Sequence, residues 1–264
     1  MQRAARARIA RALLGLARPA LAGAALALAV AGLAGCDEPS GKAIPGPEAA
    51  PAAPPPASTP AAPPAPPAPP EIIIDTSTVA VGRDHVPVGE LGLVDKVAVF
   101  LKGAPAISGA TVSVVAMRGT KPSAVAAVVA ALHQAKAAAA VVKSDARDGT
   151  TQKVPVSFPA SVPDCTTAAW IAKDASIDVW PAGGGTAHRV LKGLAGPDMT
   201  LGTEALRKQW SACGSSELLL GADDVLSWGL VFDLARAALE AAGTRVTTTV
   251  LLTSMSPGRK VILP

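Results

Sequence analysis

The spacing of hydrophobic residues between positions 71 and 264 predicts strands and helices that follow one another in the same order twice. Alternating or β-branched runs indicate strands, and apolar residues three or four positions apart indicate helices. Gly82 marks a turn and Pro105 a helix stop in the first copy, residues 71–150. The elements predicted there are strands at 72–81 and 86–88, a helix at 89–101, a strand at 111–117, a helix at 122–137 and a strand at 138–142.

The second copy, residues 176–264, follows the same order with different loops. Ile177 and Val179 alternate with polar Asp178 and predict a strand, and the glycines at 183–185 form a loop before a return strand at 188–191. The remaining predicted elements are a short helix capped by Thr203, a strand at 217–220, a helix at 228–242 and a strand at 245–252. Residues 151–175 are interpreted as a connector, so the chain is expected to contain a tandem of two small units.

The helix predicted at 228–242 has the clearest amphipathic pattern in the chain. Its apolar residues share one face at 100° per residue, while its charged residues lie opposite. A strand, this helix and a further strand with short joints form a βαβ unit, whose crossover is right-handed and whose strands are parallel. The pattern therefore predicts an α+β fold with helices on one face of mixed sheets. The apolar face consists of Val231, Leu234, Ala235, Ala238, Leu239 and Ala242.

The first 36 residues have the order of regions that a secretory signal peptide has. Four arginines precede residue 12, residues 20–33 are almost purely apolar, and Leu33-Ala34-Gly35 leads into Cys36. This ending resembles a bacterial lipobox, which implies cleavage before Cys36 and a diacylglycerol, with fatty acids such as palmitate, on its thiol. An ordinary signal peptide with a chance cysteine is the alternative. A transmembrane helix is disfavoured because the apolar stretch falls short of roughly 20 residues.

Cleavage before Cys36 changes the charge balance of the chain. The whole sequence has 24 Lys and Arg against 20 Asp and Glu, and residues 1–35 hold five of the arginines and no acid. The mature chain then carries no basic stripe, and with three Phe and no Tyr it has few rings to stack on bases, so nucleic-acid binding is not expected. Residues 36–70 form a lipidated cysteine and a linker with 13 prolines between positions 45 and 70. At roughly 3.1 Å per residue, the 26 residues from 45 to 70 predict a spacer of about 80 Å; a proline-rich ligand for a partner is the alternative.

One stretch of the second copy resembles the periplasmic domain of the ExbD/TolR biopolymer-transport family. Residues 218–228 form an apolar strand that leads into Ala222-Asp223 and an aromatic turn, and the following helix ends in Ala241-Ala242-Gly243 before a last strand. Residues 112–142 are similar more weakly, with Arg118 in place of the aspartate. The resemblance covers most of residues 71–264 and implies two tandem β-α-β-α-β units of this kind.

The N-terminal region departs from that family. ExbD and TolR are similar in keeping a transmembrane helix that contains an acidic residue, whereas this chain has no acid before Asp37. An ionisable residue inside the membrane is what a proton path requires. The resemblance therefore implies the fold of the periplasmic module without its motor function.

Cysteine usage agrees with export. With Cys36 committed to lipid, Cys165 and Cys213 remain, and two thiols in an oxidising periplasm can form one intramolecular disulfide. Two small buried cysteines are the alternative. No Cys-x-x-Cys spacing or histidine cluster accompanies them, so a metal site is not expected.

The remaining residues predict no enzyme, cofactor or catalytic site. Asp223-Asp224 fits a turn and a cap, and the glycines at 183–185 lack the lysine of a phosphate-binding loop. The serines at 215, 216 and 227 lack a Gly-x-Ser-x-Gly setting. The histidines are far apart in sequence, at His85, His133 and His188.

These features predict a non-enzymatic binding or assembly module in the periplasm, held by a lipid anchor in the inner or the outer membrane. One hypothesis is an accessory of an ExbB/ExbD-type transport system, and the alternative is a scaffold that contacts peptidoglycan. A hydrolase is a third hypothesis that the residues do not favour. A partner, or a second copy in a homodimer, is expected to add to a sheet edge at Ile177, Asp178, Val179 and Trp180. Alternatively, Trp180 packs beneath the loop at Gly183.

Overall fold

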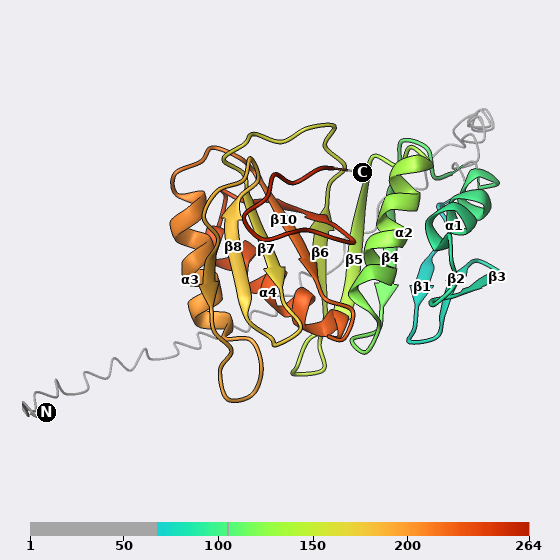
Figure 1. Ribbon diagram of the computed structural model, residues 1–264. Coiled ribbons are helices and arrows are strands. Elements are labelled where there is room, and N and C mark those ends of the chain that lie inside the picture. The colour runs from blue at the N-terminus through green and yellow to red at the C-terminus, as the bar shows by residue number, and fades with distance from the viewer. Residues whose placement is uncertain (1–67, 105, 264) are drawn as a thin grey trace, which may run out of the picture. The chain divides into compact units, whose positions relative to one another are not determined.

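The computed structural model describes residues 68–104 and 106–263 (Figure 1). The predicted signal peptide, Cys36 and most of the linker lie outside the described residues. The described part has the predicted α+β class. Its strands are β1 Ile72–Ile74, β2 Thr78–Val81, β3 Asp84–Pro87, β4 Thr111–Ala116, β5 Ala139–Asp145, β6 Thr151–Val156, β7 Thr167–Ile171, β8 Ile177–Pro181, β9 His188–Val190, β10 Glu217–Ala222 and β11 Thr248–Leu251. Its helices are α1 Leu93–Lys102, α2 Pro122–Gln134, α3 Met199–Trp210 and α4 Trp228–Ala242.

All these strands belong to one mixed sheet, in the order β3-β2-β1-β4-β5-β6-β11-β10-β7-β8-β9. The expectation of two separate sheets is therefore wrong. β6 makes the join, because it pairs antiparallel with β5 and parallel with β11. The sequence of β6 contains Pro155, a residue that argues against a central strand. For that reason the hydrophobic pattern alone left β6 in the connector.

The same order of elements occurs twice within this sheet. We call β1 to β6, residues 72–156, the first repeat, and β7 to β11, residues 167–251, the second repeat. β3-β2-β1-β4-β5 and β9-β8-β7-β10-β11 match strand for strand, with one helix before and one after β4 or β10. The two series run in opposite directions across the sheet, and β5 is antiparallel to β11 through β6. An approximate two-fold rotation about an axis normal to the sheet therefore relates the repeats.

The second repeat begins earlier than the sequence pattern indicated. β7 lies inside residues 151–175, which were interpreted as a connector, and it pairs with both β10 and β8. Its sequence, Thr-Ala-Ala-Trp-Ile, shows no alternation because four of its five residues are buried, whichever face they point to. A strand covered on both faces loses the polar positions that a period of two needs.

Helix α3 also begins earlier than predicted, at Met199 instead of after Thr203. The cap is Asp198, whose side chain accepts a hydrogen bond of 3.0 Å from the backbone N–H of Leu201. The sequence pattern did not predict the first turn of α3, because that turn contains Gly202 and glycine disfavours a helix interior. Its presence has a packing reason: a Cβ there would lie 2.5 Å from Cδ1 of Ile177.

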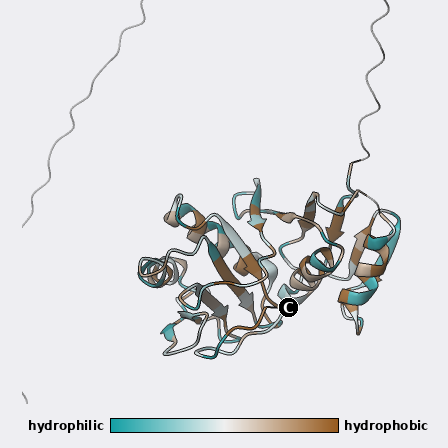
Figure 2. Cartoon of the chain, turned by 90° about the horizontal axis from the view of Figure 1, so that it is seen from above, coloured by the Kyte–Doolittle hydropathy of each residue, from teal (hydrophilic) through white to brown (hydrophobic). Residues whose placement is uncertain are grey.

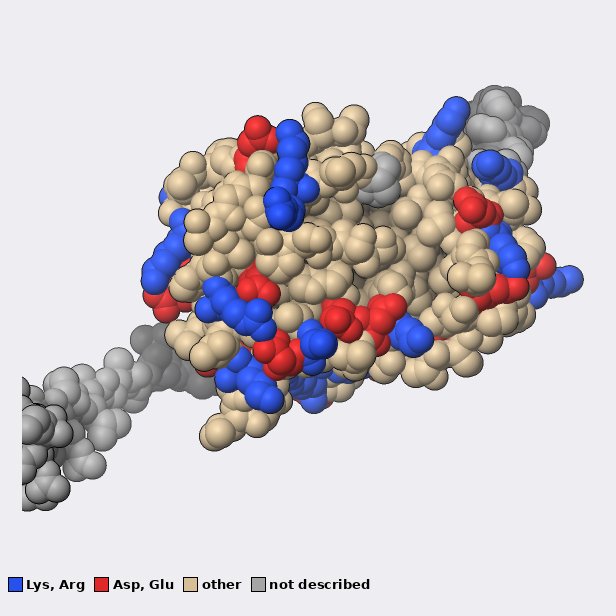
Figure 3. Space-filling model, viewed as in Figure 1, with Lys and Arg blue, Asp and Glu red and all other residues tan. Residues whose placement is uncertain are grey.

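The two faces of the sheet are covered differently. One hydrophobic core contains residues of all four helices, such as Val97, Val128, Leu206 and Leu234, so the helices cover one face of the sheet, which we call the helix face. We call the other side the open face. In the second repeat the open face is covered by Val162, in the connection between β6 and β7, and by Met255, Val261 and Leu263 of the C-terminal segment, which crosses these strands in Figure 1. Hydrophobic residues follow the strands in Figure 2 and charges of both signs intermingle along one rim in Figure 3.

Candidate functional site

The strand that holds the four predicted interaction residues lies inside the sheet. β8 pairs with β7 on one side and with β9 on the other. Ile177, Asp178, Val179 and Trp180 are all buried, with at most 4% of each residue exposed. A strand that is paired on both sides has no free main-chain groups for an added strand. The predicted position of the binding edge is therefore corrected.

Trp180 is an internal anchor of the open face. Its indole packs in a small core with Ala182, Leu219 and Leu252. Its Nε1–H donates a hydrogen bond of 2.9 Å to the carbonyl oxygen of Arg259 in the C-terminal segment. The alternative interpretation placed Trp180 beneath the loop at Gly183. The structure buries Trp180 within its own chain, and the hydrogen-bonded cover is the C-terminal segment.

Asp178 is a buried carboxylate with one loose ionic contact. Nη1 of Arg189 lies 3.8 Å from its Oδ2, while Nη2 of the same arginine lies 2.7 Å from Oδ2 of Asp174. Burial raises the pKa of Asp178; the charge of Arg189 opposes that rise and the charge of Asp174 adds to it. Hydrogen bonds from Ser176 and Arg189 lower the pKa of Asp174 to about 2. Arg189 thus stabilises the charged carboxylate of Asp174 more than that of Asp178.

We expect Asp178→Asn to raise the unfolding temperature at pH 7. The amide keeps the shape of the side chain and removes a buried charge that burial disfavours. Because the folded pKa of Asp178 is raised, the wild-type chain loses stability as the pH rises through that pKa, and the advantage of asparagine vanishes below the ordinary aspartate range. Thermal unfolding of both proteins at pH 7 and pH 3 measures this. A variant that is less stable than wild type at pH 7 would contradict it.

The predicted disulfide is present. Cys165, just before β7, is joined to Cys213, just after α3, with a Cα–Cα distance of 5.5 Å and a sequence separation of 48 residues. The bond ties the start of the second repeat to the end of its first helix.

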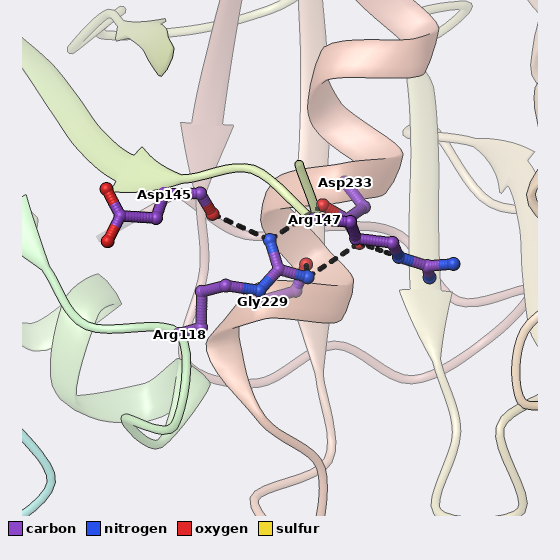
Figure 4. Close-up of polar contacts among 5 residues, drawn as sticks. All are labelled: Arg118, Asp145, Arg147, Gly229 and Asp233. Atoms are coloured by element: carbon purple, nitrogen blue, oxygen red, sulfur yellow. Dashed lines mark hydrogen bonds and ion pairs between the residues drawn. The ribbon is translucent and has the colours of Figure 1, made fainter. Parts of the chain in front are cut away.

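A polar cluster joins the two repeats (Figure 4). Nη1 and Nη2 of Arg118, after β4, donate to Oδ1 and Oδ2 of Asp233 on α4 at 2.9 and 2.8 Å. Nε of Arg147, in the turn between β5 and β6, donates to Oδ2 of the same aspartate at 2.8 Å. Arg118 also donates to the carbonyl oxygens of Asp145 and Gly229, at 2.8 and 3.4 Å. We call Arg118, Arg147 and Asp233 the seam clasp.

The electrostatics of the seam clasp favour its charged form. Burial alone would raise the pKa of Asp233, but the hydrogen bonds and charges of Arg118 and Arg147 outweigh it and lower that pKa. The hydrogen bond to Asp233 raises the pKa of Arg118. Both carboxylate oxygens of Asp233 are bonded, and its side chain is only 12% exposed. The arrangement indicates a structural tie.

Main-chain contacts strengthen this seam. The N–H groups of Trp228 and Gly229 donate to the carbonyl oxygens of Thr120 and Arg118, at 2.7 and 2.9 Å. Asp224 accepts bonds of 3.0 and 2.6 Å from the N–H and Oγ of Ser123, so it caps α2 of the other repeat. Sequence analysis expected a turn and a cap at Asp223-Asp224 but had no signal that the cap crosses between repeats.

The histidines lie apart in the structure, as the sequence indicated. His85 is on β3 and His188 is on β9, at opposite ends of the sheet. His133, on α2, stacks on Phe158 with ring centroids 5.4 Å apart. The glycines at 183–185 lie in the loop between β8 and β9.

The two ends of the sheet, β3 and β9, are where the described chain leaves strand edges. Antiparallel neighbours alternate between residue pairs that exchange hydrogen bonds and pairs that do not. The bonds Ala172 N–Ser176 O and Ala182 N–Thr166 O flank the β7–β8 pairing, so even-numbered residues of β8 bond to β7 and odd-numbered residues bond to β9. Arg189 lies opposite even-numbered Asp178. Its own N–H and C=O therefore point away from β8, toward the open edge.

The same alternation shows that the β3 edge offers fewer main-chain donors to an added strand. The bond from Val88 N to Ser77 O sets the alternation, so His85 and Pro87 direct their main chain outward. Proline has no N–H to donate, and prolines on edge strands discourage strand addition. The two-fold relation places Leu191 where the first repeat has Pro87. Thus β9 and the residue after it keep both outward donors, whereas β3 has lost one.

A groove of about 410 Å³ runs beside the β9 edge. β9 and residues 191–192 form one wall and α3 forms the other. Leu191 and Leu201 are 70% and 51% exposed, and the α3 wall also contains buried Ala205. The charged residues that line it are Arg189, Lys192, Asp198, Glu204 and Lys208. A groove beside an open strand edge, with apolar side chains on both walls and charged side chains around them, is an arrangement that can take an extended peptide.

Comparison with known proteins adds no relative: no family matches the chain, and neither does any curated protein or solved structure. The resemblance to the ExbD/TolR family therefore stays a prediction from the residues that carry it. Within the described residues, the helices are too short or too polar to cross a membrane.

Proposed function

We propose that this chain is a non-enzymatic binding module of the cell envelope, which adds an extended segment of a partner protein to the β9 edge. The observation that carries the proposal is the coincidence of outward main-chain groups at Arg189 and Leu191 with the groove along α3. The main chain of the partner would bond to β9. Its alternate side chains would pack against Leu201 and Ala205, while those between them point to the open face.

The difference between the repeats supports a single working edge. In a symmetric tandem both ends of the sheet would attract strands, and such edges promote aggregation unless they are protected. Pro87 protects the first repeat, and the second repeat has Leu191 in its place. An exposed leucine at an unprotected edge lowers solubility when the edge is free. Its presence is therefore typical of a surface that a partner covers part of the time.

The proposed location and partner class rest on the N-terminal sequence together with this edge. Lipid on Cys36 and the proline-rich spacer would hold the module in the periplasm, close to membrane proteins. A strand edge binds through hydrogen bonds to the main chain of an extended polypeptide. This favours an envelope protein over peptidoglycan as the partner. An accessory role in an ExbB/ExbD-type transport system is the form of this proposal that the sequence resemblance favours.

Photo-crosslinking in intact cells tests the proposal. A crosslinking amino acid at position 201 of the full-length chain is expected to give a discrete protein adduct. Arg189→Pro is expected to reduce that adduct at least tenfold relative to Arg189→Ala. Both variants lose the ion pairs with Asp174 and Asp178, but only proline also removes the outward N–H, and the main-chain bonds between β8 and β9 stay in place. His85→Pro, the matched change on β3, is expected to leave it unchanged.

For the comparison to count, Arg189→Pro must keep the unfolding temperature of Arg189→Ala, which loses the same ion pairs, and His85→Pro that of the wild type. Each variant must also keep the Cys165–Cys213 disulfide. An adduct of equal yield in Arg189→Pro would overturn the proposal. An adduct to a second copy of the chain would show that β9 serves a homodimer, which also overturns a partner protein as the occupant.

A further inference from the structure

The open face of the first repeat is bare where that of the second repeat is covered. In the second repeat, Trp180, Leu219 and Leu252 pack with Val162 and with the C-terminal segment, and are at most 6% exposed. In the first repeat, Ile73 on the same face is 42% exposed. No described segment of the chain forms a comparable core on that side of β1 to β6.

Apolar residues from four neighbouring strands meet on this bare face. Ile73 lies opposite Val115, and Val141 lies opposite Pro155. Their neighbours along each strand point to the helix face and are buried, so these four side chains are the ones that the sheet leaves partly in water. Val141 lies opposite Ser113, two residues before Val115 on β4, so the two apolar pairs are diagonal neighbours and form a stepped apolar strip across β1, β4, β5 and β6.

Two lysines extend this strip. Lys143 on β5 and Lys153 on β6 are direct cross-strand partners on the open face, and Val115 lies opposite Lys143 on the other side. Like charges directly opposite one another destabilise a sheet. Neither lysine forms an ion pair with a described residue. The carboxylate next along β5, Asp145, accepts a bond from Thr151 instead.

We propose that this bare face binds an extended segment of a partner protein that carries acidic and apolar side chains. The second repeat shows that the fold accepts extended chain here: the residue equivalent to Val141 is Val250, which a segment of this chain covers. The residue equivalent to Lys143 is Leu252, so the first repeat has a positive charge where the covered repeat has an apolar residue. Carboxylates of the partner would neutralise the opposed lysines.

This surface is distinct from the β9 groove, since it lies in the other repeat. The proposal therefore does not depend on the proposed function. A chain with both surfaces can hold two partners at once, which is what an assembly module does.

The test uses two fluorescent peptides, (Val-Glu)₄ and (Val-Lys)₄, with the purified full-length chain in detergent. The acidic peptide is expected to bind and the basic one is not. The double change Lys143→Glu/Lys153→Glu is expected to weaken binding of the acidic peptide at least tenfold. The matched control Lys102→Glu/Lys136→Glu changes two exposed lysines away from this face and from the β9 groove, and is expected to leave binding unchanged.

A second readout separates binding from folding. Lys153→Glu alone turns a like-charge pair into an opposite-charge pair, so it is expected to raise the unfolding temperature by about 1–2 °C while it weakens binding of the acidic peptide. Equal binding of both peptides, or binding unaffected by the double reversal, would overturn the proposal. Binding of the acidic peptide only after deletion of residues 45–67 would also overturn it, because the linker would then be the occupant.

Discussion

Replacing Cys165 and Cys213 by serine is expected to lower the free energy of unfolding by about 4 kcal/mol, the loop-closure value for a crosslink of this span. The bond closes a loop over 48 residues that contains β7, β8, β9 and α3. For a folded unit of this size, a loss of about 4 kcal/mol lowers the unfolding temperature by roughly 8–16 °C. Urea unfolding of the purified double variant beside the wild type measures the change.

The reducing agent dithiothreitol supplies the control. It should destabilise the wild type by a similar amount and leave the double-serine variant unaffected. If reduction and double substitution both leave the urea midpoint in place, the second repeat does not depend on this bond.

Asp233→Ala is expected to lower the free energy of unfolding by about 2 kcal/mol. The change removes the acceptor that both Arg118 and Arg147 use and leaves two arginines unpaired at the seam. Breaking a fully buried ion pair costs more, but Arg118 and Arg147 are 30% and 67% exposed, so water compensates part of the loss. Glu240→Ala, on the same helix but outside the seam clasp, is the matched control and should have little effect.

The pH dependence of this loss has a definite sign. The pKa of Asp233 is lowered in the folded chain, so its contribution is complete above the unfolded value near 3.9 and disappears as the pH falls through the folded value. The stability gap between wild type and Asp233→Ala should therefore be full at pH 7 and shrink at pH 2–3. A gap of equal size at both would mean that the side chain acts through packing and not through its charge.

Periodicity in the sequence could predict the elements that have one wet face. α4 was recognisable because its apolar residues form one stripe, and β4 because Val112 and Val114 alternate with less buried neighbours. β7 was missed because the chain covers both of its faces. The helical start at Met199 was missed because Gly202 makes room for Ile177, a contact that no local pattern encodes.

The sequence could predict the type of binding surface but not its position. Sequence analysis expected strand addition at a sheet edge but chose β8, because the strand that makes β8 internal, β7, was not recognised. Pro87 was the available signal that one edge is protected, and its use requires the register of β2 and β3. Arg118 and Asp233 are 115 residues apart, so only the tertiary fold brings the seam clasp together.

The central claim is that β9 hydrogen-bonds to a partner strand, and amide hydrogen exchange measures that bond directly. The full-length chain should be purified from its own cells with the bound partner and compared with the free chain. The account predicts that exchange at the amides of Arg189 and Leu191 is slowed at least tenfold in the complex, while exchange at His85 on β3 is unchanged. Equal exchange rates at Arg189 and Leu191 in the free and bound chain would contradict it.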